Sequence, residues 1–140
     1  MPNHGDITAV DWDTIAPVDI VTAGFPCTDV SLAGEPAGLN PGTRSGIWCH
    51  VALAISVLNP RLVVIEHVRG LLSAPAARSM GPDRRPVEPG QRAGALRGLG
   101  AVLGDLATLG FDAEWEVHRA ADAGAPHRRE RVFILARPQA

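Results

Sequence analysis

Two side chains of this 140-residue chain, those of Cys27 and Glu66, could carry out chemistry together. Cys27 follows a proline just beyond an apolar run, where a thiol can be exposed and held in position. Cysteine reacts as its thiolate, so a polar or electropositive environment would make Cys27 a nucleophile. A lone cysteine can equally be a buried structural residue, and position alone does not decide between these two interpretations.

The second side chain is Glu66, which follows four apolar residues at 62–65. A carboxylate in this place is costly unless it lies at the end of a strand or is paired. The alternative is a solvated or salt-bridged carboxylate without a catalytic role. A thiol and a carboxyl group at adjacent strand ends would form a nucleophile and acid pair.

These side chains need elements that position them, and the apolar patterns predict an alternation of strands and helices. Strands are expected at 18–23, 61–68, 111–118 and 131–136, and helices at 47–58 and 96–109. This order indicates an α/β domain with a largely parallel sheet. Ligands bind beyond the carboxyl ends of the strands in such sheets, which places Cys27 near Glu66. The proline-rich segment 73–90 is expected to be a flexible loop.

Composition narrows the class of protein but does not select a function. The chain is 46% hydrophobic and 20% charged, which is ordinary for a globular domain. Its formal charge of -2 argues neither for nor against nucleic acid, because its positive charge is local, as in Arg128, Arg129 and Arg131. That arginine group can also be a solvated face.

With two cysteines and no HxxxH pair, no metal site is expected. No apolar run is long enough for a bilayer and no leader is recognisable, so a cytoplasmic protein is expected.

Four short motifs occur in an order typical of one enzyme family. Gly24-Phe25-Pro26-Cys27, followed by Ser31, Ala33 and Gly34, resembles the catalytic loop of DNA cytosine-5 methyltransferases. Glu66-His67-Val68 resembles their Glu-Asn-Val motif, and 124–133 resembles their Gln-x-Arg-x-Arg motif with the strand that follows it. The segment 3–8 looks like the one whose acid meets the cofactor's adenine. The resemblance covers nearly the whole chain and implies a Rossmann-like methyltransferase domain that uses S-adenosylmethionine.

The resemblance also implies a role for each matched residue. A cytosine would flip out of double-stranded DNA, and the Cys27 thiolate would attack its C6 so that C5 can accept a methyl group. Glu66 would hold the N3 and N4 edge and favour protonation at N3. Arg131 would bind the base oxygen O2, and Arg129 would help to organise the pocket.

Four further residues are implied for the cofactor. Asp6 and Ile7 would contact its adenine, whereas Pro26 and Ile47 would line its site. Taken without the resemblance, Asp6 could simply cap a turn.

Three positions depart from the family pattern. Thr28 stands where the family usually has Gln after the cysteine, His67 replaces the Asn after the glutamate, and His127 replaces the Gln of the arginine motif. The Asn is thought to brace the Pro-Cys loop by hydrogen bonds. Because histidine has a different shape, we expect weaker bracing here.

The resemblance further predicts a partial catalytic domain, spanning residues 1–140, that lacks parts at both ends. The family's first strands, with their Phe-x-Gly-x-Gly turn, and its target-recognition region have no counterpart in these residues. We therefore expect an incomplete cofactor site and a chain that is inactive alone. The strand at 18–23 would be an exposed edge, to which a second polypeptide carrying the missing parts could add a strand.

Two other functions remain open on the sequence. One is a non-catalytic DNA-binding or assembly subunit derived from the same fold, which the changes at His67 and His127 favour slightly. The other is an unrelated thiol enzyme, which the absence of a second cysteine near Cys27 disfavours.

Overall fold

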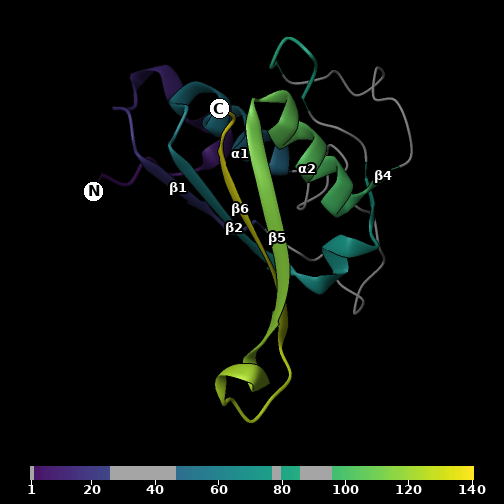
Figure 1. The fold of residues 1–140 in the computed structure, drawn as a ribbon. Coiled ribbons are helices and arrows are strands. Elements are labelled where there is room, and N and C mark those ends of the chain that lie inside the picture. The colour runs from purple at the N-terminus through teal and green to yellow at the C-terminus, as the bar shows by residue number, and fades with distance from the viewer. Residues whose placement is uncertain (1, 26–46, 77–79, 86–95) are drawn as a thin grey trace.

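The computed structural model describes residues 2–25, 47–76, 80–85 and 96–140. Figure 1 shows their main elements, which are β1 (Ile20–Ala23), α1 (Trp48–Leu58), β2 (Leu62–Val68), β3 (Pro75–Ala76), β4 (Leu96–Arg97), α2 (Gly98–Thr108), β5 (Phe111–Arg119) and β6 (Glu130–Pro138). Short 3-10 helices include η1 (Ile7–Ala9), η2 (Trp12–Thr14), η4 (Arg69–Leu72) and η6 (Ala120–Ala123). The predicted helices and main strands are all present, with ends that differ by one or two residues.

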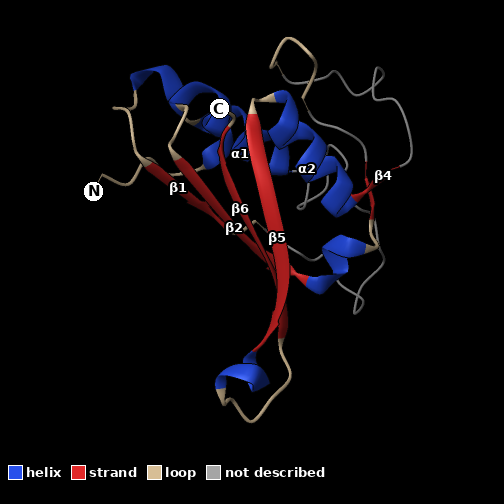
Figure 2. Cartoon of the chain, in the orientation of Figure 1, coloured by secondary structure: helices blue, strands red, loops and turns tan. Residues whose placement is uncertain are grey.

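Four strands form one sheet in the order β1-β2-β6-β5, with the small β3–β4 ladder apart from it (Figure 2). β1 pairs with β2 in parallel, whereas β6 is antiparallel to both β2 and β5. Three strands therefore point the same way and β6 alone is reversed. The α/β class is confirmed, but the expected largely parallel sheet is a mixed one. β6 is reversed because β5 turns directly back into it through η6, and such a hairpin can only join antiparallel strands.

The helices α1 and α2 pack on one face of this sheet. Val63, Ile65 and Ile134 point toward them and are fully buried, together with Ile55 of α1 and Leu106 of α2. Burial alternates along β2, so this strand has one core face rather than two, as alternation of side chains in a sheet requires.

The opposite face of the sheet is more exposed. Ile20 on β1 keeps 56% of its surface accessible and Leu135 on β6 keeps 41%. Among the described residues, β1 is also the terminal strand, paired with β2 alone. Within the described ranges, the outer edge of β1 therefore has no strand beside it, and apolar side chains lie next to this edge.

Part of segment 73–90 is packed against the core, whereas residues 82–85 are exposed. Ala74, Ala76 and Met80 are buried, and the Met80 backbone N–H donates to Asp105 Oδ1 at 3.1 Å. Asp105 is itself fully buried in α2, and its Oδ2 accepts from Trp48 Nε1 at 2.9 Å. The carboxylate joins α1, α2 and residue 80, because a buried carboxylate needs donors. The prediction of a flexible loop therefore does not fit residues 74, 76 and 80, which are buried. Residues 77–79 and 86–90 of the segment lie outside the described part of the chain.

The hairpin of β5 and β6 extends well beyond the other strands, with η6 at its tip (Figure 1). The hairpin closes where the Ala120 N–H donates to the carbonyl oxygens of Arg128 and Arg129, at 3.2 Å in each case. Gly124 ends η6 at a φ of 88°, which favours glycine. The hairpin carries residues 128–131 back to the sheet. No helix among the described residues is long and apolar enough to cross a membrane.

Candidate active site

Glu66 of β2 and Arg131 of β6 form an ion pair on the open face of the sheet. Arg131 Nε lies 2.6 Å from Glu66 Oε1. Glu66 is in register with Phe133, and Arg131 with Val68, so the pair is diagonal across two neighbouring antiparallel strands. Diagonal neighbours are within reach of long side chains on the same face. The structure therefore brings together two of the predicted site residues.

Both members of the pair remain accessible to a ligand. The Glu66 side chain is 43% exposed and that of Arg131 is 23% exposed. Arg131 Nη1 also donates to the backbone oxygen of Glu130 at 2.9 Å. Arginine has more N–H donors than these two contacts use, and a carboxylate has more acceptor positions than one bond fills. The pair can thus donate to one ligand atom and accept from another.

A hollow of about 280 Å³ lies beside this pair, at the carboxyl ends of β1 and β2. Its lining consists of Thr22, Ala23, Gly24, Val64 and Glu66, of which Glu66 is the charged member. A Cβ atom built on Gly24 would lie 3.6 Å from Glu66 Oε2. The chain segment that leads to Cys27 thus passes beside the glutamate, as expected for two neighbouring strand ends. Cys27 and Pro26 themselves lie outside the described residues.

The residue two positions before Cys27 is anchored by aromatic contacts. Phe25 is buried, and its ring centroid lies 4.4 Å from that of His67 and 5.6 Å from that of Trp48. His67 is buried too, and its Nδ1 lies 3.3 Å from the Val68 carbonyl oxygen. The His67 ring therefore packs against Phe25, at an interplanar angle of 44°. Tilted aromatic pairs of this kind are stabilising.

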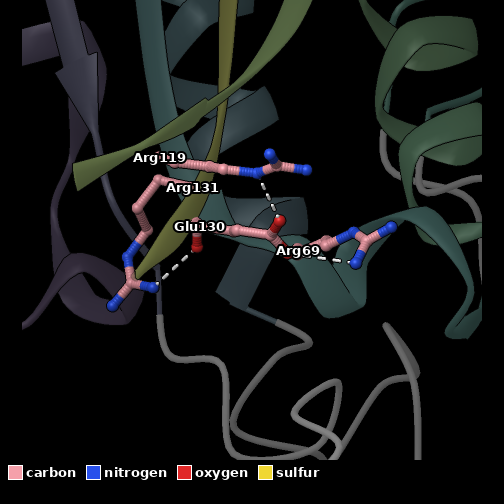
Figure 3. Close-up of polar contacts among 4 residues, drawn as sticks. All are labelled: Arg69, Arg119, Glu130 and Arg131. Carbon is pink, nitrogen blue, oxygen red and sulfur yellow. Dashed lines mark hydrogen bonds and ion pairs between the residues drawn. The ribbon is translucent and has the colours of Figure 1, made fainter. Parts of the chain in front are cut away.

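A second charged cluster lies at the start of β6, on the other side of the strand from Arg131 (Figure 3). Glu130 Oε2 accepts from Arg69 Nη1 at 3.0 Å, and Glu130 Oε1 accepts from Arg119 Nε at 2.9 Å. The hydrogen bond from Arg119, together with the charge of Arg69, lowers the pKa of Glu130 below its ordinary value. Sequence reasoning missed this cluster because the three residues come from different elements.

Of the residues predicted for a cofactor, Ile7 lines a larger apolar hollow of about 570 Å³. The hollow runs beside β1 and α1, with Ala23, Val51 and Ala54 in its wall. Ile47 precedes α1 and is half-buried against the core. No Asp, Glu, Lys or Arg is among the residues described as lining this hollow. The described lining is therefore mostly apolar and offers no side chain of these four types to the charged ends of an amino acid.

Asp6 caps η1 next to this hollow. Its Oδ1 accepts from both the backbone N–H and the hydroxyl group of Thr8, at 2.9 and 2.8 Å. These bonds, the backbone one first, lower the pKa of Asp6. The turn-capping interpretation is what the structure shows. A contact with adenine would have to use the other carboxylate oxygen.

Arg129 is exposed and lies just before β6, and the structure does not bring it into the Glu66–Arg131 pair. Within the described ranges, no group of His, Cys, Asp or Glu side chains is arranged to hold a metal ion. The described site is therefore the Glu66–Arg131 pair with the nearby ends of β1 and β2.

Comparison with known proteins places this geometry in a family. The model of the C-5 cytosine-specific DNA methylases matches residues 1–139. The chain belongs to this family. Among its relatives are the Type II methyltransferase M.NlaIV of Neisseria lactamica and M.NgoBV of Neisseria gonorrhoeae, which are 34% and 32% identical to it over 131 residues.

This C-5 cytosine-specific methylase chain covers a limited part of these relatives. The alignments span 94% of this chain but 28% of each of the two Neisseria proteins. The solved structure of S. pombe Dnmt2 methyltransferase is similar in fold, with a TM-score of 0.63 at 15% identity, over 99% of this chain and 37% of that one. This methyltransferase fold, with the family match, confirms the resemblance and the partial Rossmann-like α/β architecture.

Proposed function

We propose that this chain acts in the transfer of a methyl group to C5 of cytosine in DNA and holds the target base at Glu66 and Arg131. The observation that carries this proposal is the ion pair between these two side chains, 2.6 Å apart at the carboxyl end of β2. A carboxylate beside a guanidinium offers an acceptor next to a donor. That is the complement of the N4 amino group and the O2 oxygen on the edge of cytosine.

The hollow beside Glu66 supports the same proposal. A base can enter such a site only after it leaves the duplex stack, so the target cytosine of double-stranded DNA would be flipped. Glu66 would hold its N3 and N4 edge while Arg131 donates to O2. Arg129, which is exposed just before β6, would help to organise this pocket.

Cys27 would be the nucleophile. Its thiolate would form a bond to C6 of the cytosine, and the displaced electron pair would make C5 nucleophilic. Once C5 carries the methyl group, its proton leaves and the electrons of that C–H bond restore the double bond as the C6–S bond breaks. The thiolate is thereby returned and the product is 5-methylcytosine.

S-adenosylmethionine would supply the methyl group as an electrophile, with the bond between its sulfonium sulfur and the methyl carbon breaking so that S-adenosylhomocysteine leaves. The described residues fit its adenine part, because Ile7 lies in the apolar wall beside β1 and Asp6 lies next to it. Ile47, half-buried before α1, and Pro26, outside the described residues, would complete this side of the site. No described lining residue complements the methionine part.

The test is transfer of labelled methyl from S-adenosylmethionine to unmethylated DNA by the purified chain. Label in cytosine that is absent with Cys27→Ala and strongly reduced with Glu66→Gln would support the proposed roles and would overturn the expectation that the chain is inactive alone. Methyl transfer that survives in Cys27→Ala would contradict the proposed nucleophile. A folded chain that transfers no methyl would contradict catalysis by the chain on its own.

The exposed sheet face favours a second candidate, a role as a DNA-binding or assembly subunit. Ile20 and Leu135 lie on this face, and β1 ends the described sheet beside a large apolar hollow. A strand from a second polypeptide would pair with β1 and cover the hollow. A chain that transfers no methyl but forms a stable complex with a partner, lost on Val21→Pro, would support this candidate.

A further inference from the structure

The cluster around Glu130 brings two arginines from different elements to one place. Arg69 begins η4 directly after β2, and Arg119 ends β5, while Glu130 begins β6 between these two strands. Each guanidinium group contributes one nitrogen to the Glu130 carboxylate, Nη1 from Arg69 and Nε from Arg119. One carboxylate thus holds both cations next to the turn of the β5–β6 hairpin (Figure 3).

The two arginines face solvent although both are held. Their side chains are 62% and 58% exposed, whereas that of Glu130 is 22% exposed. Most of their N–H donors are left for another anion, because an arginine has more donors than one such contact uses. The exposed Arg128 and Arg129 follow in the same hairpin, so the positive charge exceeds that of the central glutamate.

The position of the cluster relates it to the candidate active site. Glu130 and Arg131 are neighbours in β6, and their side chains point to opposite faces of the strand. Arg131 also donates to the Glu130 backbone oxygen, at 2.9 Å. The cluster therefore lies at the same end of the sheet as the Glu66–Arg131 pair, one residue along β6 from Arg131.

We propose that Arg69 and Arg119 form a binding site for DNA phosphate groups, with Glu130 holding the two guanidinium groups in position. The choice of DNA as the partner rests on the function proposed above. The chain as a whole carries a formal charge of -2, so general attraction cannot supply its affinity for DNA. Local cationic sites must do so, and arginine forks match phosphate geometry.

The experiment measures binding of a fluorescein-labelled duplex by anisotropy, at salt concentrations from about 50 to about 200 mM. The chain is compared with Arg69→Gln, Arg119→Gln and the double variant. Each lost phosphate contact should lower the slope of log affinity against log salt by about 0.9, and the double variant should lose about twice that. The loss should be the same for a duplex with cytosine and for one of dA and dT alone, because phosphate contacts carry no base information.

Arg61→Gln is the matched control, since Arg61 is exposed at the other end of β2 and the same charge is removed. Its salt slope should equal that of the unaltered chain. The single variants each leave one arginine on Glu130, so they test the site even if the double variant does not fold. An unchanged slope in both single variants, or no binding by the unaltered chain at the lowest salt, would overturn the proposal.

Glu66→Gln separates this proposal from the proposed function. It should abolish most methyl transfer and leave the salt slope unchanged, since it removes no phosphate contact. If Glu66→Gln transfers methyl normally while the arginine variants lose salt dependence, the phosphate site stands and the role of Glu66 fails. If Glu66→Gln loses methyl transfer while the arginine variants keep the salt slope of the unaltered chain, the role of Glu66 stands and the phosphate site is refuted.

Discussion

Arg131 Nε lies 2.6 Å from Glu66 Oε1, although the two residues are far apart in the sequence. They meet because β6 runs antiparallel to β2 and lies directly beside it, in a register that puts Arg131 opposite Val68. Two charged side chains on the same face of adjacent strands then form a donor and acceptor pair. The function of this pair should therefore depend on the shape of the cation as well as on its charge.

Arg131→Lys should lower the rate of methyl incorporation about 100-fold, because lysine keeps the charge but lacks the planar fork that directs separate nitrogens at Glu66, the Glu130 oxygen and a base oxygen. The initial rate with labelled S-adenosylmethionine measures the effect. Arg137→Lys, an exposed residue farther along β6, is the control and should act like the unaltered chain. Equal rates for the two variants would argue against a role of Arg131 in the site.

His67→Ala should lower the free energy of unfolding by about 2 kcal/mol, since it leaves a space against the Phe25 ring. His67→Asn, which restores the family's residue, keeps polar groups but not the ring contact, and we expect an intermediate loss. Urea unfolding followed by circular dichroism measures both values. His127→Ala, at an exposed position, should have almost no effect. A loss from His67→Ala no larger than that control would contradict the packing argument.

Asp105→Ala should destabilise the chain by about 3 kcal/mol, because the Trp48 indole N–H and the Met80 backbone N–H would lose their acceptor inside the core. Asp105→Asn can still accept through one oxygen and should cost less. Thermal unfolding and Trp fluorescence provide the measurement. Asp19→Ala, on an exposed position before β1, serves as the control and should unfold like the unaltered chain.

The stabilising effect of Glu130 should depend on pH. The pKa of Glu130 is lowered in the folded chain, first by the hydrogen bond from Arg119. A lowered pKa means that its contribution is present above the ordinary value of 4.5 and is lost as the pH falls through the folded value. The difference in Tm between the unaltered chain and Glu130→Gln should thus be largest near neutral pH and shrink in acid. A difference that stays constant down to about pH 3 would contradict a charged role for Glu130.

Local patterns were sufficient to predict most elements of this fold. The apolar run before Glu66 predicts β2, and the helical spacing before Asn59-Pro60 predicts α1, which ends with Asn59 at a φ of 44° and its N–H bonded to Ile55. The order of the motifs also led to the methyltransferase family. These features depend on neighbouring residues, whose spacing is written directly in the chain.

Segment 73–90 shows where local patterns fail. Its prolines and charges predict a flexible loop, yet Met80 is buried and bonded to Asp105, a residue of a later helix. This hydrogen bond depends on how α2 packs against α1, so it cannot be predicted from the residues of the segment alone. The same holds for Phe25, whose ring meets His67 from a different strand.

By itself, the sequence determined the elements and their order, because backbone preference and hydrophobic spacing act between near neighbours, and it supplied the candidates for reactive side chains. The tertiary structure decided that β6 is inserted in reverse between β2 and β5, and thereby which side chains meet. Strand order and register depend on packing between segments distant in the chain. For this reason Glu66 and Arg131 could be named as candidates from the sequence. Their ion pair, and the ion pairs of Glu130 with Arg69 and Arg119, could be seen only in the folded structure.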